Sequence, residues 1–123
     1  MDFSTLFMHE TDTVRFSPGS SILKRGEPSN VMYVLLDGEA EIRLGGSVVE
    51  LARAGALLGE LALIDHSPGS ADVVARTDCR LVAIDERRFR FLVQQTPHFA
   101  LDVMKVIADR LRAMNARLAS ITG

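Results

Sequence analysis

The chain has 123 residues, a length typical of a single domain. Hydrophobic residues make up 47% of it and charged residues 24%, and 14 basic against 16 acidic side chains give a formal charge of −2. So balanced a charge excludes a strong global field for nucleic acid. The single cysteine, Cys79, excludes an internal disulfide framework and a four-thiolate metal site.

The sequence carries no membrane or export signal that we recognise. No apolar run approaches the roughly 20 residues of a membrane span. The first residues lack the basic start and long apolar core of a signal peptide. We therefore expect a cytoplasmic protein with no membrane association.

Dense turn signals in the first two thirds of the chain separate short apolar or alternating runs. The runs predict strands over residues 14–16, 21–23, 31–36, 39–44, 47–51, 71–75 and 80–84. Asp37-Gly38 and Gly45-Gly46 are predicted as two-residue hairpin turns. Alternation predicts that Ile42 and Leu44 face a core. Short strands at this spacing favour a mainly β fold, an antiparallel β-roll or jelly roll over about residues 13–85.

Helices are predicted to follow the strands. Asp85 is a plausible N-cap for a short helix over residues 86–95. Thr96 and Pro97 begin a second, long helix that reaches about residue 120, with Thr96 as the cap. At the other end of the chain, Phe3, Leu6 and Phe7 suit one helical turn packed on the body. We expect a single domain over residues 1–123, with the C-terminal helices over about 86–121.

The long helix carries apolar residues at alternating spacings of three and four. This seam, the pattern of a coiled coil, comprises Met104, Ile107, Leu111, Met114, Leu118 and Ile121. The seam either packs on the chain's own strands or pairs two copies as a homodimer. We favour the dimer, because a domain of this size has little surface left to cover so long a stripe.

The stretch over residues 55–73 holds the most informative chemistry. Gly59 and Glu60 open a short apolar helical turn, and Pro68-Gly69-Ser70 leads into a strand. Amides at a helix start beside a hydroxyl form a small anion cradle, and Glu60 at its mouth suits hydrogen bonds from sugar hydroxyls. The alternative is a tight connection in which Glu60 caps its own helix.

Seven motifs occur in a fixed order along the chain. They are residues 16–23 (FSPGSSIL), Gly26-Glu27, residues 32–39 (MYVLLDGE), 58–63 (LGELAL), 68–71 (PGSA) and 77–79 (TDC), and Leu111-Arg112. The set resembles that of cyclic-nucleotide-binding domains of the catabolite activator and protein kinase A regulatory subunit type. The resemblance covers roughly the whole chain and implies a β-roll with flanking helices and a phosphate-binding cassette over residues 58–73.

The resemblance implies roles for individual residues. A glutamate at Glu60 binds the ribose 2′-hydroxyl, while Ser70 and nearby amides contact the cyclic phosphate of cAMP or cGMP. The implied ligand-binding set is Gly59, Glu60, Leu61, Ala62, Gly69, Ser70 and Ala71.

Three positions depart from the family pattern. The phosphate-pairing arginine is replaced by Gly69, a threonine or serine by Asp72, and an aromatic residue by Leu58. A hydrogen bond to a charged group contributes roughly 1.5–3 kcal/mol, so losing the arginine costs roughly tenfold to more than a hundredfold in affinity. Arg53 and Arg76 lie near the cassette in sequence, but we interpret both as solvated surface charges.

Other classes of function have little support. The histidines, His9, His66 and His98, lack the close spacing of a metal site. Cys79 lies in an apolar strand, which is typical of a buried thiol. No Gly-x-Ser-x-Gly elbow is present, so we expect no enzyme activity.

Nucleic-acid binding is not expected either, because Arg110, Arg112 and Arg117 form only a mild basic cluster. The chain ends at Gly123, where transcription factors of the family continue into a DNA-binding domain, so we expect a stand-alone domain.

Two hypotheses follow. The first is a sensory module that binds a cyclic nucleotide or related anion and signals through an unidentified partner chain. The second is a ligand-independent dimerisation or adaptor protein that keeps the fold and has lost nucleotide binding at Gly69.

Overall fold

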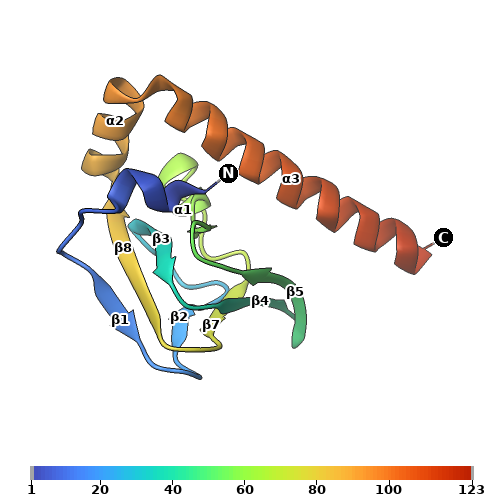
Figure 1. The fold of residues 1–123 in the computed structure, drawn as a ribbon. Coiled ribbons are helices and arrows are strands. Elements are labelled where there is room, and N and C mark those ends of the chain that lie inside the picture. Colours follow the sequence, from blue (N-terminus) through green and yellow to red (C-terminus); the bar gives the residue numbers. More distant parts are fainter. Residues whose placement is uncertain (1, 123) are drawn as a thin grey trace. The chain divides into compact units, whose positions relative to one another are not determined.

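The computed structural model describes residues 2–122 (Figure 1). The chain divides into two compact units, residues 1–89 and 90–123. The first unit holds the strands and the second most of the helical sequence. The strands are β1 (Val14–Phe16), β2 (Ser21–Leu23), β3 (Val31–Asp37), β4 (Ala40–Leu44), β5 (Ser47–Ala52), β6 (Leu57–Leu58), β7 (Asp72–Ala75) and β8 (Cys79–Asp85).

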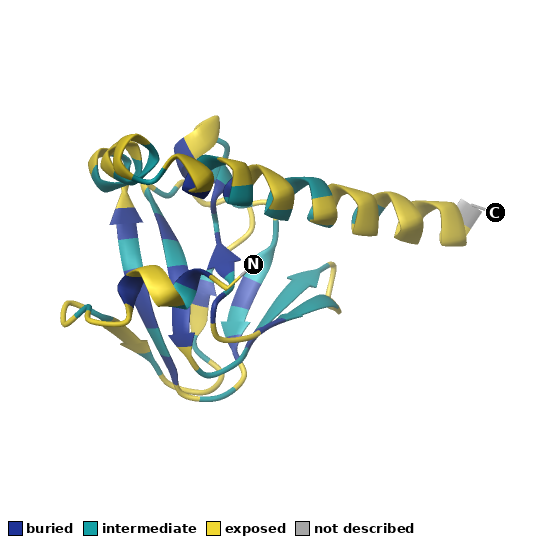
Figure 2. Ribbon diagram, turned by 45° about the horizontal axis from the view of Figure 1, so that its top comes forward, coloured by how far each residue is buried: buried dark blue, intermediate teal, exposed yellow. Residues whose placement is uncertain are grey.

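The strands form two antiparallel four-stranded sheets, in the orders β1-β8-β3-β6 and β2-β7-β4-β5. The hydrophobic core lies between them, because its members come from both sheets: Ile22, Leu35, Ala40, Ala52, Leu58, Val73, Ala75, Cys79 and Leu81. Figure 2 shows the resulting alternation of buried and less buried positions along the strands. The predicted β-roll is thereby confirmed.

Strands β3 and β8, at the centre of the first sheet, are buried on both faces. Along β3 and β8, Val34 and Val82 are register partners with no exposed surface. The neighbouring pair, Leu35 and Leu81, is equally buried and belongs to the core between the sheets. Since successive side chains of a strand point to opposite faces, both sides of this pair of strands are covered.

One predicted turn is wrong. Asp37 ends β3 and Ala40 begins β4, but β3 pairs with β6 and β8, whereas β4 pairs with β5 and β7. The Asp37-Gly38 segment is therefore a crossover between sheets and not a hairpin. The distinction depends on long-range pairing, which the local turn signal does not contain.

The second predicted turn is confirmed. Gly45 and Gly46 join β4 to β5, with Leu44 opposite Ser47, and have φ values of 57° and 85°. Two successive positive φ angles are the geometry of a tight hairpin turn, which glycine adopts without steric cost. Ile42 packs against the core as predicted, while Leu44 is only half-buried.

The N-terminal turn is a 3₁₀ helix, η1 (Phe3–Phe7), in which Phe3 and Phe7 are buried as predicted. Leu6 differs from the prediction, since 40% of its surface is exposed. The Phe3 amide donates to the Gly55 carbonyl at 2.9 Å. The Arg88 guanidinium lies 5.1 Å from the centre of the Phe7 ring.

Three helices complete the chain: α1 (Leu61–Ile64), α2 (Glu86–Gln95) and α3 (Pro97–Thr122). The predicted cap of α2 is confirmed, since the Asp85 carboxylate accepts a hydrogen bond from the Arg88 amide at 2.9 Å. At the start of α3, the Thr96 backbone carbonyl accepts from the Phe99 amide at 2.8 Å.

The apolar seam follows the C-terminal two thirds of α3. Met104, Leu111, Leu118 and Ile121 each expose more than half of their surface, between 54% and 79%. Ile107 and Met114 are half-buried. Within residues 2–122, no helix is long and apolar enough to cross a membrane.

Candidate functional site

The cassette begins where β6 meets a short helix. Leu57 and Leu58 pair with β3 and are fully buried. Gly59 then has a φ of +74°, and a β-carbon there would lie 2.8 Å from Leu23 Cδ1. Two features therefore favour glycine at this position: the positive φ angle, and the Leu23 side chain of β2, which leaves little room for a β-carbon.

Glu60 is the one buried charged residue among those the structure describes, with 6% of its surface exposed. It occupies the N-cap position of α1 in a helical conformation, and its side chain makes no capping hydrogen bond. The interpretation that Glu60 caps its own helix is therefore wrong: the helical φ and ψ do not present the carboxylate to the first amides. Its backbone carbonyl instead accepts from the Leu63 amide at 3.2 Å.

The rest of α1 is apolar on its inner side. Ala62 is buried and Leu61 half-buried. The short helix thus holds the predicted residues Gly59, Glu60, Leu61 and Ala62 in one turn against the sheet. Its contacts with β3 fix the first half of the cassette.

A loop joins the two halves of the cassette. The Asp65 carboxylate accepts from the Ser67 amide at 3.0 Å, and its hydrogen bonds with Ser67 lower the pKa of Asp65. Between them, His66 has a φ of +57°. Among residues 2–122, it is the one residue other than glycine with a positive φ. Left-handed backbone at a side chain of this size is strained.

The second half of the cassette is tied to the turn between β2 and β3, residues 24–27, which we call the β2–β3 turn. The Gly69 amide donates to the Glu27 carbonyl at 3.0 Å, and the Gly69 carbonyl accepts from the Gly26 amide at 2.8 Å. A β-carbon at position 69 would lie 2.6 Å from the Lys24 carbonyl oxygen. An arginine here therefore requires a shift of the turn, and so does any other side chain.

Asp72 strengthens the same connection. Its carboxylate accepts a hydrogen bond from the Arg25 amide at 2.9 Å. The two departures at positions 69 and 72 thus act together, because both bind the β2–β3 turn. Ser70 is exposed and Ala71 half-buried between them.

Both halves of the cassette meet the same short stretch of chain. Leu23 contacts Gly59, and residues 24–27 contact Gly69 and Asp72. This stretch was not among the residues predicted for the site. Gly26-Glu27 was one of the seven ordered motifs, so the sequence did indicate a turn there. It did not indicate that the turn contacts Gly69 and Asp72.

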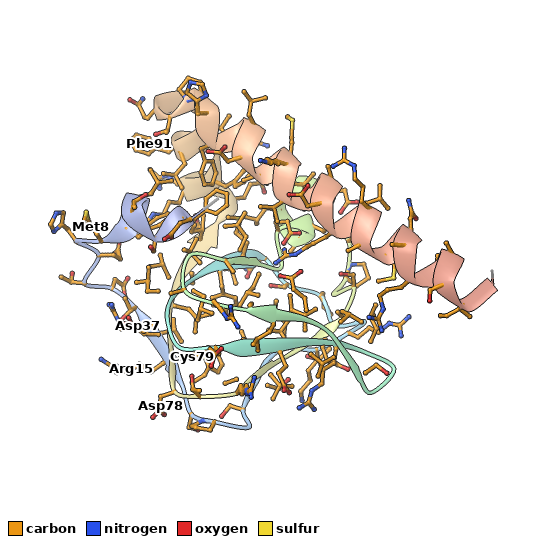
Figure 3. The ribbon with its side chains drawn as sticks, turned by 45° about the vertical axis from the view of Figure 1, so that its right-hand side comes forward. Met8, Arg15, Asp37, Asp78, Cys79 and Phe91 are labelled. Carbon is orange, nitrogen blue, oxygen red and sulfur yellow. The ribbon has the colours of Figure 1, made fainter. Side chains whose placement is uncertain are left out.

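The remaining candidate residues are either exposed charges or a buried thiol. Arg53 is exposed and forms an ion pair with Glu39 at 3.5 Å, and Arg76 is exposed, so both are surface charges as predicted. Cys79, labelled in Figure 3, lies at the start of β8. It is buried, as predicted, and burial raises the pKa of its thiol. Among residues 2–122, no group of three or more His, Cys, Asp or Glu is placed to hold a metal ion.

Known proteins share this sequence pattern and fold. Residues 13–96 match the family model of the cyclic nucleotide-binding domain. The cAMP-dependent protein kinase regulatory subunit of Colletotrichum orbiculare is 34% identical over 84 residues, which are 67% of this chain and 22% of that protein. The chain thus spans about a fifth of that relative's length.

Solved structures agree. The Thermus thermophilus catabolite activator protein superposes with a TM-score of 0.80 at 25% identity, over 96% of this chain and 58% of that one. The regulatory subunit of a cAMP-independent protein kinase A from Trypanosoma brucei gives a TM-score of 0.68 at 25% identity, over 80% of this chain and 35% of that one. With its β-roll, its cassette and the family match over residues 13–96, the chain belongs to the cyclic nucleotide-binding domain family.

Proposed function

We propose that the chain is a non-enzymatic regulatory module whose cassette binds a cyclic nucleotide or a related small anionic ligand. The burial of Glu60 at the start of α1 carries the proposal. A carboxylate only accepts hydrogen bonds, and the free 2′-hydroxyl on the ribose of a cyclic nucleotide donates one. With 6% of its surface exposed, Glu60 is largely shielded from bulk water. A hydrogen bond from a ligand hydroxyl would therefore help to stabilise its carboxylate.

Titration of the purified protein with cAMP and cGMP by calorimetry tests the proposal. Glu60→Gln keeps the shape of the side chain and removes its charge, so we expect affinity to fall about tenfold or more. Glu50→Gln, which changes a carboxylate on β5, is the matched control and should leave affinity unchanged. Absence of heat and of any thermal shift at millimolar ligand would contradict nucleotide sensing.

A second candidate is a ligand-independent adaptor with the same fold. Two observations favour it: Gly69 supplies no cation, and the Asp72 carboxylate is bound to the β2–β3 turn. A similar structure is that of the regulatory subunit of a cAMP-independent protein kinase A. This candidate predicts that the wild type binds no nucleotide, whereas Gly69→Arg creates or improves binding once the β2–β3 turn has shifted to admit the new side chain. Micromolar binding by the wild type would reject it.

We also propose that a second copy of this chain pairs with it through α3. The seam repeats with heptad spacing, and four of its six residues are more than half exposed. Leu111→Glu with Leu118→Glu should give a monomer in light scattering, while Ala116→Glu with Ala119→Glu, on the polar face, should not. A wild type that is already monomeric would refute the dimer.

A further inference from the structure

The space beside Gly69 is occupied by the β2–β3 turn. A β-carbon at position 69 would lie 2.6 Å from the Lys24 carbonyl oxygen and 3.6 Å from the Arg25 α-carbon. The Arg25 α-carbon therefore lies in van der Waals contact with the point where a side chain at position 69 would begin. The two residues are 44 positions apart in the sequence, so no local pattern reveals their proximity.

We propose that Arg25 supplies the cation that pairs with the ligand's anionic group in this cassette. This rests on the proposed function, since it names the phosphate-binding residue of the same site. Arg25 is exposed. Its guanidinium offers a planar pair of donors that matches two phosphate oxygens, which the point charge of a lysine does not.

The backbone of Arg25 is held in place relative to Ser70. Its amide donates to the Asp72 carboxylate at 2.9 Å, and the adjacent Gly26 amide donates to the Gly69 carbonyl at 2.8 Å. The turn is thus bonded on both sides of Ser70, to the residue before it and to the second residue after it. A side chain on a fixed backbone loses less freedom when it binds than one on a mobile loop.

Asp72 has a defined part in this arrangement. Its carboxylate brings a negative charge near the anion, but it also fixes the Arg25 amide. Asp72→Asn retains an oxygen that accepts this hydrogen bond and removes the charge. We therefore expect Asp72→Asn to bind cAMP at least as tightly as the wild type, and Asp72→Ala to bind it more weakly.

Calorimetric titration with cAMP and with adenosine, which has the same base and ribose without the phosphate, tests the role of Arg25. Arg25→Gln should weaken cAMP binding about tenfold to a hundredfold and leave adenosine binding unchanged. Lys24→Gln removes the same charge one residue away and is the matched control. It should change cAMP affinity less than threefold, and both variants should melt within a few degrees of the wild type.

The outcomes separate this inference from the function on which it rests. If the wild type binds cAMP and Arg25→Gln binds it equally well, the inference is overturned and the proposed function stands. Equal losses in Arg25→Gln and Lys24→Gln, or an equal loss for adenosine, also overturn it, because the effect is then not specific to a placed guanidinium. A wild type that binds neither cAMP nor cGMP overturns both.

Discussion

Replacement of Gly69 by alanine probes the contact between the cassette and the β2–β3 turn most directly. The added β-carbon would lie 2.6 Å from the Lys24 carbonyl oxygen, and β-carbons in proteins essentially never come closer than 3.0 Å. The turn must therefore move by at least 0.4 Å, the difference between the two distances. This movement strains the 2.8 Å and 3.0 Å hydrogen bonds that Gly69 makes with the turn.

The magnitude follows from those two bonds. Their complete loss would cost about 1–3 kcal/mol. The lower entropy of the unfolded chain with alanine returns about 0.4–1 kcal/mol. We expect a net loss of about 1 kcal/mol in the free energy of unfolding, or a decrease of about 4 °C in Tm for a domain of this size.

Urea denaturation followed by circular dichroism measures this loss. Ser70→Ala changes the adjacent exposed residue and should be neutral. Gly19→Ala separates the effect of a steric clash from that of backbone conformation, because Gly19 has a φ of +85° and open space around it. A Gly69→Ala variant as stable as the wild type would show that the turn yields freely, and the reasoning on positions 69 and 72 would be refuted.

Three further predictions concern stability and reactivity. The hydrogen bond from Arg88 lowers the pKa of Glu10, so the stability it gives is present above the ordinary pKa of a glutamate and is lost as pH falls through the lowered value. Glu10→Gln, which keeps Arg88 over the Phe7 ring, should therefore reduce Tm at pH 7, by the equivalent of about 0.5–1 kcal/mol for a partly exposed pair, and the difference should vanish near pH 2; a difference that persists at pH 2 contradicts this assignment. His66→Gly should raise the free energy of unfolding by about 1 kcal/mol in urea titrations, because it relieves the left-handed backbone, and a fall would show that the His66 side chain has a stabilising contact. Burial raises the pKa of Cys79, so stability from this group is present below the ordinary thiol pKa and falls as pH rises above it; a thiol reagent at pH 8 should label the native protein far more slowly than the urea-unfolded chain, and equal rates would contradict the burial.

Local patterns predicted most of the strands because each short run lies between clear turn signals. The runs at 14–16 and 21–23 became β1 and β2 with unchanged bounds, and 86–95 became α2. The two-residue strand β6 was missed, since Leu57 and Leu58 give too short a run for any alternation to be visible. Its pairing with β3 depends on the fold as a whole.

The site was less predictable than the fold, and for a physical reason. The spacing of Gly59 and Glu60 predicted the short helix α1, but the burial of Glu60 depends on strands that surround it in space. At Gly69, the sequence showed which side chain was absent. It did not show that the Lys24 carbonyl oxygen lies 2.6 Å from the position of a β-carbon at residue 69.

The bonds between the cassette and the β2–β3 turn also bear on how such a site changes during evolution or redesign. Residues 24–27 and 69–72 fit each other, so a substitution in one segment has an effect that depends on the other. Transfer of residues 58–73 alone into a related β-roll would leave behind residues 24–27, to which Gly69 and Asp72 are hydrogen-bonded. A chimera that exchanges both segments together should fold and bind as its donor does. Either single exchange should lower stability and affinity, and the two effects should not add up to that of the double exchange.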